Sequence, residues 1–461
     1  MERLITNDLS NKIGQQVLIK GWMNALRVLG NLGFMVIRDR GGMVQIVIED
    51  KEQIKKVKHL QPGSIISVLG TVQQSEHTVT GVELISPEIT VEFPVTSPLP
   101  VEYNKPDLKA EIDTILDYRP LTLRNPKISA VFKIQATIVK AYREYLITQG
   151  FTEFFGPNII GASSEGGTEL FTVNYFDQEA KLSQSAQLYK QMMVGVYERV
   201  FALMKCFRAE KSATRRHLTE ATQFEFEMGF IEDFSEIMDM LENTVKYIVK
   251  SVQNENSNEL KTLGVELAMA PEDVSFPRVT FKDALEIYYQ RTGTDERHEI
   301  DLSPEAEREL CKYAREEFGT DFIFVTHFLR KKTAFYAHPN DENPEVTNYF
   351  DLLCREAEIV SGGQRIHDHD MLEESLRLKD LNPDDFRDYL AIFKYGMPKH
   401  GGFGMGMERL TMLLLGLDNI REATLFPSDT KRIASVSIKQ KAMEGSQLVQ
   451  KIRKLFDEAG V

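Results

Sequence analysis

The chain has 461 residues, of which 42% are hydrophobic and 27% are charged, and a formal net charge of −14 at pH 7. This length exceeds one ordinary hydrophobic core, so we expect a globular protein of two or three domains. Three widely spaced cysteines without a CxxC pair argue against a disulfide framework or a zinc site and favour a reducing cytosol.

The N-terminus, MERLITNDLSNK, has no basic stretch followed by an apolar one, so it is unlike a secretory signal peptide. No uninterrupted apolar run reaches the length of a membrane span. We therefore expect a soluble, cytoplasmic protein with no membrane partner. Residues 1–95 contain ten basic and ten acidic residues, so the excess acid lies in the rest of the chain. Any contact with phosphate must then come from a local basic patch.

The first ninety residues show the pattern of short strands rich in β-branched residues. Gly, Asn and Asp turn residues separate five such runs, at 17–23, 34–39, 43–49, 64–72 and 82–91. A helical insert, KEQIKKVKHL, lies between the third and fourth runs at 51–60. This order favours a small closed barrel of the oligonucleotide-binding (OB) type, with another small barrel or a sandwich as the alternative.

A proline-rich segment, FPVTSPLPVEYNKP, is typical of a linker. Beyond it a helix is predicted at 127–150, where apolar residues recur every three or four positions up to Gly150. Strand-like runs follow, with helices between them, at 151–157, 224–232, 322–328 and 349–360. Strands and helices do not alternate strictly, which favours an α+β domain. The predicted division is a barrel at 1–92, a linker at 93–126 and an α+β domain at 127–461.

The common nucleotide-binding and hydrolase motifs are absent. The chain has no GxxxxGK[ST] and no GxGxxG between a strand and a helix, and it has neither HExxH nor GxSxG. If the protein binds a nucleotide, we expect it to do so with side chains more than with a glycine-rich loop.

One candidate is the segment FRAEKSATRRHL at 207–218, which follows a predicted strand and precedes another. Five of its side chains are cationic or can become so, among them Arg208, Arg216 and His217. Arginines on a tight loop between strands can bind phosphate or carboxylate in a bidentate manner. The alternative is a solvated surface turn.

Two further segments suit a nucleotide. In KYGMPKHGGFGMGMERL, at 394–410, glycines allow a backbone to approach a flat ligand, and Arg409 follows them. The plain alternative is a glycine-rich strand that leads into a helix. The second segment, at 350–365, places Asp351, Glu358 and Ser361 near Arg365. Such hard oxygen ligands can hold Mg²⁺ on a triphosphate.

These segments, in this order, resemble the class II aminoacyl-tRNA synthetases. FRAE with its loop and RHL resembles the second signature motif, GMGMERL the third, and GFTEFFGPNII at 150–160 the first. With the barrel, the layout is similar to the aspartyl, asparaginyl and lysyl subgroup (IIb), most of all to the compact archaeal-type aspartyl enzymes. The resemblance covers essentially the whole chain. It implies an α+β catalytic domain built on an antiparallel sheet flanked by helices.

The resemblance implies an enzyme that joins the α-carboxylate of an amino acid to the α-phosphorus of ATP with release of pyrophosphate, and then passes the acyl group to tRNA. Arg208 and Arg409 would be catalytic. The fixed guanidinium of Arg208 would stabilise the charge that gathers on the α-phosphate, and Arg409 would hold the outer phosphates with Arg216 and His217. A divalent ion, Mg²⁺, would be held by Asp351, Glu358 and Ser361. ATP would contact Arg208, Glu210, Arg216, His217, Leu218, Glu358, Gly406, Met407, Glu408 and Arg409.

For the amino acid, the resemblance implies aspartate. Lys190 of QLYK and Arg365 of GGQR match the positions that clamp its side-chain carboxylate, and a buried carboxylate needs such fixed positive charge. Glu225 departs from the aspartyl pattern and is more like asparaginyl enzymes. The implied substrate contacts are Glu165, Gln187, Lys190, Arg208, Glu225, Ser361 and Arg365.

The resemblance also implies partners. Arg27, Phe34 and Gln45 match barrel positions that contact anticodon bases, and the first signature motif forms a homodimer interface in this class. The expected product is aspartyl-tRNA-Asp, with tRNA-Asn as a possible second acceptor. The alternatives are an asparaginyl-tRNA synthetase, a diverged adenylating paralogue that forms an amide or another product, or a catalytically silent nucleic-acid-binding protein.

Overall fold

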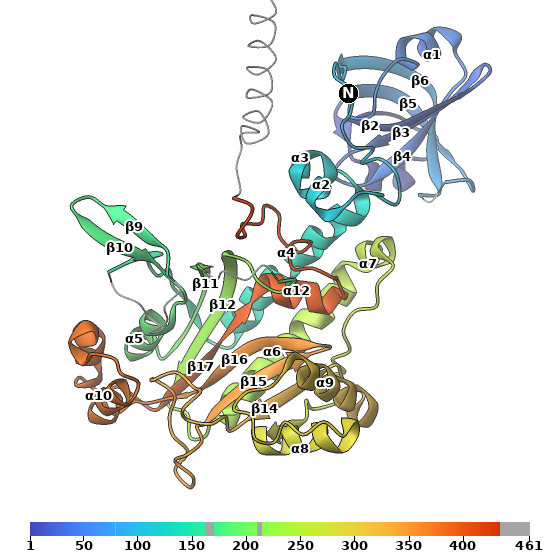
Figure 1. The fold of residues 1–461 in the computed structure, drawn as a ribbon. Coiled ribbons are helices and arrows are strands. Elements are labelled where there is room, and N and C mark those ends of the chain that lie inside the picture. Colours follow the sequence, from blue (N-terminus) through green and yellow to red (C-terminus); the bar gives the residue numbers. More distant parts are fainter. Residues whose placement is uncertain (79, 162–169, 210–213, 434–461) are drawn as a thin grey trace, which may run out of the picture. The chain divides into compact units, whose positions relative to one another are not determined.

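The computed structural model describes residues 1–78, 80–161, 170–209 and 214–433 (Figure 1). The chain forms two compact units, Met1–Ser129 and a second that begins at Ala130. The segment predicted as a linker belongs to the first unit, where it carries two short helices, α2 (Ile112–Asp117) and α3 (Arg119–Thr122).

The first unit contains a closed five-stranded barrel. Its strands are β2 (Gln16–Leu29), β3 (Leu32–Arg38), β4 (Met43–Ile48), β5 (Ile65–Gln74) and β6 (Val82–Phe93). The strand order is β2-β3-β4-β6-β5, and β5 pairs again with β2 to close the barrel. A short strand, β1 (Arg3–Leu4), pairs parallel to β2. The predicted OB-type barrel is thus confirmed.

Helix α1 (Lys51–Val57) is the predicted insert between β4 and β5. Its start is fixed by Asp50, whose side chain accepts a hydrogen bond from the Glu52 amide, as an N-cap residue should. Alternate residues of the strands, such as Met35 and Ile37 on β3, are fully buried and form the barrel core. The period of two leaves the residues between them on the outer face.

The second unit is built on an eight-stranded sheet. Its order is β13 (Arg278–Thr280), β14 (Phe322–Thr326), β15 (Tyr349–Cys354), β16 (Ala357–Arg365), β17 (His400–Gly406), β12 (Glu220–Gly229), β11 (Arg199–Phe207) and β7 (Thr152–Glu153). Neighbouring strands from β14 to β11 are antiparallel, whereas the two edge pairs, β13–β14 and β11–β7, are parallel. The predicted α+β domain with an antiparallel sheet is confirmed.

Helices surround this sheet (Figure 1). They are α4 (Pro126–Thr148), α5 (Gln187–Tyr197), α6 (Ser235–Glu255), α7 (Ser257–Leu263), α8 (Phe281–Thr292), α9 (Pro304–Phe318), α10 (His369–Leu378), α11 (Arg387–Phe393) and α12 (Met407–Leu415). A small separate sheet has the order β8 (Ile159–Ile160), β10 (Gln178–Leu182) and β9 (Thr172–Tyr175). In the part of the chain that the structure describes, no helix is long and apolar enough to cross a membrane.

The two faces of the central strands differ in chemistry. Phe224 and Phe226 of β12 and Phe403 of β17 pack with α4, α6 and α12 in the largest hydrophobic core. The residues that alternate with them, Glu225 and Glu227 on β12 and Gly402, Gly404 and Gly406 on β17, belong to the opposite face. This polar, glycine-rich face carries the candidate site.

Two predicted strand runs differ in the structure. Run 151–157 contains only the two-residue β7, because Gly156 and Pro157 interrupt it, and Pro lacks the amide hydrogen that a sheet ladder needs. Run 349–360 is a hairpin of β15 and β16, because the chain turns at Arg355, where φ is 56°.

Candidate functional site

A cavity of about 540 Å³ opens on the polar face of the second unit's sheet. It is lined from β12, β16, β17, α5 and the segment after β11. The predicted site residues that line it are Gln187, Lys190, Arg208, Arg216, His217, Leu218, Glu225, Glu358, Ser361, Arg365, Gly406, Glu408 and Arg409. The structure therefore brings together the three segments that the sequence singled out.

Four residues predicted for the ATP, aspartate and metal sites are not among the residues that line the cavity. Glu165 and Glu210 lie outside the described residues. Met407 does not line the cavity, because its side chain packs against the hydrophobic core under α12. Asp351 is also absent from the lining. It is paired with Ser361 across the β15–β16 hairpin, and Ser361 does line the cavity.

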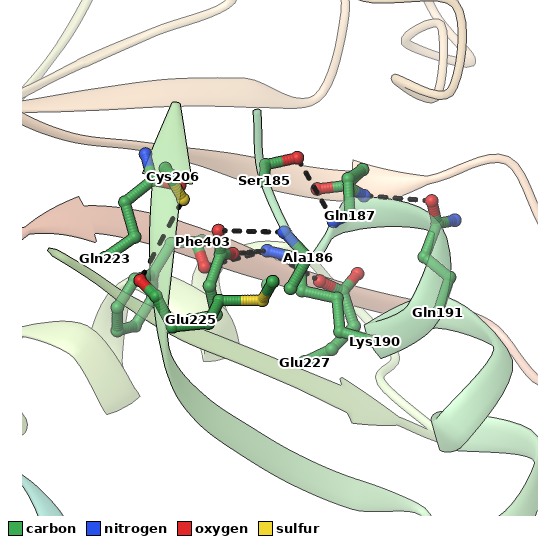
Figure 2. Close-up of polar contacts among 12 residues, drawn as sticks. Ser185, Ala186, Gln187, Lys190, Gln191, Cys206, Gln223, Glu225, Glu227 and Phe403 are labelled. Carbon is green, nitrogen blue, oxygen red and sulfur yellow. Dashed lines mark hydrogen bonds and ion pairs between the residues drawn. The ribbon is translucent and has the colours of Figure 1, made fainter. Parts of the chain in front are cut away.

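Lys190 lies at the floor of the cavity with only 1% of its side chain exposed. Its Nζ donates to Glu225 Oε2 at 2.7 Å and to the Phe403 carbonyl at 2.8 Å (Figure 2). Helix α5 begins at Gln187, so Lys190 sits in the first turn and faces β12. Burial at this depth excludes the plain alternative of a solvated surface lysine.

Arg365 is the second buried cation. Its Nε donates to Glu227 Oε1 at 2.9 Å and its Nη2 to the Gly402 carbonyl at 2.8 Å. Burial alone would raise the pKa of Glu227, but Arg365 and Lys190 hold that pKa below its usual value. Conversely, burial works against the charged guanidinium, yet Glu227 raises the pKa of Arg365. Each charge is stabilised by the other.

The four side chains form one array, because Lys190 Nζ also lies 3.4 Å from Glu227 Oε2. The charges of two cations and two carboxylates cancel, so the four side chains together carry no net charge. Sequence reasoning missed Glu227. The alternation Phe-Glu-Phe-Glu on β12 places it on the same face as Glu225, and this pattern could have revealed it.

The opposite end of the cavity carries the arginines. Arg208 is exposed at the start of the loop after β11, and its amide donates to the Thr219 carbonyl at 3.0 Å, which closes the base of that loop. Arg216 Nη1 donates to Glu307 Oε2 at 3.0 Å. Arg409 Nη1 donates to the Glu358 carbonyl at 3.0 Å. These guanidinium groups suit a polyanion at this end.

Glu408 has a structural contact within this site. Both of its carboxylate oxygens accept from the Thr222 amide, at 3.1 and 2.9 Å, so it anchors α12 to β12. Burial raises the pKa of Glu408, and the Thr222 amide opposes that rise.

The carboxylates of Asp351, Glu358 and Glu307 form a group close to Arg409, and not every oxygen of this group has a hydrogen-bond partner. Ser361 Oγ donates to Glu358 Oε1 at 2.7 Å, and the enclosed Oδ1 of Asp351 has no hydrogen-bond partner. Burial raises the pKa of Asp351 well above its usual range, and Glu358 raises it further. Burial and Glu358 likewise raise the pKa of Glu307. An oxygen donor set that repels itself and leaves one oxygen unpaired fits a divalent cation.

Two family models match the chain. Residues 111–430 match the class II tRNA synthetases (D, K and N), and residues 17–92 match the OB-fold nucleic acid binding domain. The chain belongs to the class II tRNA synthetases. The first model covers more than half of the chain, including every residue of the cavity.

Relatives of this synthetase match nearly its whole length. The aspartate–tRNA(Asp/Asn) ligase of Thermus thermophilus is 42% identical over 94% of this chain and 99% of its own. The aspartate–tRNA(Asp) ligase of Pyrococcus horikoshii is 42% identical over 93% of this chain and 98% of its own. Among solved structures, the asparaginyl-tRNA synthetase of Pyrococcus horikoshii complexed with asparaginyl-adenylate has a TM-score of 0.87 at 34% identity, covering 94% of this chain and 100% of its own.

The barrel of the synthetase presents the three predicted anticodon residues on its outer face. Arg27 on β2 pairs with Phe34 on β3, and Gln45 on β4 is opposite Val36. Phe34 is half-buried and alternates with the core residues Met35 and Ile37. Gln45 Nε2 donates to Glu83 Oε2 at 3.0 Å.

The carboxylate group gives a prediction that does not depend on activity. A raised pKa in the folded state means that the ionised Asp351 carboxylate opposes folding above its ordinary pKa near 4. Without divalent cations at pH 7, Asp351→Asn should therefore stabilise the protein, by on the order of 1 kcal/mol. Below about pH 4 the gain should vanish, because the carboxyl is then protonated in both states.

Thermal unfolding at the two pH values measures this effect. Asp384→Asn is the matched control, because Asp384 is 79% exposed and should change little. Added Mg²⁺ with ATP should raise the melting temperature of the wild type more than that of Asp351→Asn. If Asp351→Asn is no more stable than the wild type at pH 7, the Asp351 carboxylate does not have a raised pKa in the folded protein.

Proposed function

We propose that this synthetase activates L-aspartate with ATP and transfers the aspartyl group to tRNA-Asp. The observation that carries the proposal is the pair of buried cations, Lys190 and Arg365, at the floor of the cavity. The names of the relatives support it, because both curated ligases described above are aspartate enzymes. Relatives named for tRNA(Asp/Asn) support tRNA-Asn as a second acceptor.

The charged array explains why aspartate suits the cavity. In the structure Lys190 pairs with Glu225, and both line the cavity. Aspartate carries an α-ammonium and a β-carboxylate, so it can replace this pair with two new ones. The β-carboxylate then pairs with Lys190, and the ammonium pairs with Glu225. No buried charge is left without a partner, which is the condition for burying ions at acceptable cost.

Asparagine would leave this exchange incomplete. The ammonium of asparagine can pair with Glu225, but its neutral side-chain amide cannot form the ion pair with Lys190 that the β-carboxylate of aspartate forms. Lys190 would then lose its main ionic partner inside the protein. The observation that favours asparagine is Glu225 itself, together with the asparaginyl enzymes among the similar structures. Pyrophosphate exchange with aspartate and with asparagine, run in parallel, distinguishes the two.

The activation step needs no general base, because a carboxylate is already ionised at neutral pH. One α-carboxylate oxygen attacks the α-phosphorus of ATP, and pyrophosphate leaves with the electrons of the broken P–O bond. Arg208 would stabilise the charge on the α-phosphate, while Arg216, His217 and Arg409 would hold the outer phosphates. In the second step the terminal ribose hydroxyl of tRNA attacks the acyl carbon, and AMP leaves.

Mg²⁺ is the cation that we propose for the group of Asp351, Glu358 and Ser361. When bound, it would neutralise and orient the phosphates. The compartment that we propose is the cytoplasm, where tRNA and ATP are available for translation. Three buried free cysteines suit a reducing compartment.

Lys190→Met tests the choice of amino acid. The variant leaves the aspartate β-carboxylate without its ammonium partner, and losing one partner of a buried pair costs about 3–5 kcal/mol. Aspartate activation, measured as kcat/KM in pyrophosphate exchange, should fall about a hundredfold to several thousandfold. Activation of asparagine should fall much less, and the KM for ATP should barely change.

Two further variants make this test decisive. Lys190→Met with Glu225→Gln removes both charges and so avoids an unpaired buried carboxylate. Lys205→Met is the matched surface control, since that lysine side chain is 46% exposed. If both Lys190 variants fold and still activate aspartate within a few-fold of the wild type, Lys190 is not the selector.

Phe34→Ala tests the anticodon face. If a base stacks on Phe34, the variant loses about 1–3 kcal/mol of tRNA binding, because stacking on an aromatic ring has this strength. Aminoacylation at limiting tRNA should fall about fivefold to a hundredfold, while pyrophosphate exchange without tRNA stays unchanged. Val36→Ala, two residues along the same strand face, is the matched control. Equal loss in both assays would identify Phe34 as structural.

We also propose a homodimer formed through the first signature motif. In this segment Phe155 is 83% exposed and Pro157 is also exposed, although Phe151 and Phe154 of the same segment are buried. Phe155→Asp should therefore convert the dimer to a monomer at micromolar concentration, as measured by sedimentation. Leu378→Asp, at an exposed leucine on α10, should leave the mass unchanged. A monomeric, fully active wild type would contradict the proposal.

A further inference from the structure

A chain of buried amide and ring groups runs behind the cavity. Gln187 and Gln191 lie one turn apart on α5, and Gln187 Nε2 donates to Gln191 Oε1 at 2.9 Å (Figure 2). Gln191 Nε2 lies 3.0 Å from His400 Nε2. The Tyr389 hydroxyl donates to Gln191 Oε1 at 3.0 Å. Gln191 and His400 are fully buried, so each polar atom needs a partner inside the protein.

His400, at one end of this chain of hydrogen bonds, determines which group donates and which accepts in each of them. His400 Nδ1 lies 2.8 Å from the Pro398 carbonyl, which can only accept, so Nδ1 carries the proton. Burial lowers the pKa of His400 to about 4, although Glu227 opposes the shift, so the ring is neutral at pH 7. Its Nε2 is therefore an acceptor.

Each amide must then take one orientation. Gln191 has to present its NH₂ group to His400, which turns its oxygen towards Gln187 and Tyr389. Gln187 has to present its own NH₂ group to that oxygen. Its carbonyl oxygen consequently lies on the side away from Gln191, as Figure 2 shows. Gln187 lines the cavity, whereas Gln191 does not.

This end of the cavity is rich in donors, and an amino acid bound there also needs acceptors. Lys190 and Arg365 supply donors for a carboxylate of the substrate at this end, and Arg208 supplies donors for phosphate at the opposite end. The one cation of an amino acid, its α-ammonium, needs acceptors, and Glu225 is the carboxylate that lines this end. An amide that was free to turn would present its NH₂ group as readily as its oxygen, and the NH₂ group repels an ammonium.

We propose that Gln191, held by His400 and Tyr389, is a positioning residue that fixes the Gln187 amide with its oxygen towards the α-ammonium of the substrate. The proposal rests on the proposed amino-acid site, because it assigns Gln187 to the substrate ammonium. Gln191 acts through Gln187 and has no contact with the substrate.

The test compares aspartate with succinate, the same dicarboxylate without the α-ammonium, in Gln191→Met. Methionine has a similar shape but cannot accept from Gln187. The KM for aspartate in pyrophosphate exchange should rise about five- to tenfold, the effect of one hydrogen bond of ordinary strength. The inhibition constant of succinate and the KM for ATP should stay within about twofold. Gln135→Met, at a buried, hydrogen-bonded glutamine of α4, is the matched control.

A second variant separates orientation from packing. Gln191→Glu keeps an acceptor for Gln187, and its other oxygen can pair with a protonated His400, so its KM for aspartate should lie nearer the wild type than that of Gln191→Met. A purely structural role predicts the opposite order, because a buried carboxylate harms a fold more than methionine does. Equal weakening of aspartate and succinate, or no change in either, would overturn the proposal.

Failure of the proposed function would be recognised separately. It would appear first as a wild type that exchanges pyrophosphate with asparagine and not with aspartate. The same comparison then uses asparagine and succinamate, its counterpart without the ammonium, and the orientation of Gln187 is tested as before.

Discussion

The buried array of Lys190, Arg365, Glu225 and Glu227 is the constraint on which the rest of the site depends. Four charges inside a protein are tolerated only when they are close and hydrogen-bonded. The carboxylates of Glu225 and Glu227 therefore lie in contact with the neighbouring strand β17, where Gly402 and Gly404 have no side chain to obstruct them. A Cβ at Gly402 would lie 2.2 Å from Glu227 Oε2 and 2.0 Å from the Phe226 carbonyl. Glycine at position 402 thus leaves room for the Glu227 carboxylate.

The same array links the site to the core. Strand β12 alternates phenylalanine with glutamate, so one strand supplies Phe224 and Phe226 to the hydrophobic core and two carboxylates to the cavity floor. Tyr142 of α4 stacks on Phe224, with ring centroids 4.4 Å apart, and its hydroxyl donates to the Glu225 carbonyl at 3.0 Å. The backbone that carries the catalytic face is therefore held from the apolar side. A rigid floor favours catalysis, because the charges need no reorganisation when the substrate reacts.

Local patterns in the sequence predicted the elements well, since periodicity and turn residues determine them. The five barrel strands, the helix α4 and the glycine-rich strand before α12 are all present. Three segments that line the cavity were also identified by their unusual density of arginine, glycine and acid, whereas Gln187 and Lys190 of α5 were identified only through the family resemblance. The partners of the buried cations were not, because Glu227 and Arg365 are 138 residues apart and meet only through the order β12-β17-β16. Gln191 and His400 were missed for the same reason: each looks ordinary until the fold brings them together.

From the sequence, Lys190 and Arg365 were expected to bind the substrate's side-chain carboxylate together, but the array gives the two cations different roles. Glu225 lines the cavity and is within reach of a ligand, whereas Glu227 does not line it and has no exposed surface. The Lys190–Glu225 pair can therefore exchange partners with a substrate, but the Arg365–Glu227 pair cannot lose Glu227 without leaving a buried carboxylate alone. Arg365 is consequently a fixed element that keeps positive charge at the cavity floor, with Glu227 holding the guanidinium in place. Under the proposed function, discrimination between a charged and a neutral amino-acid side chain then depends on the one pair that can open, and Lys190 is its cation.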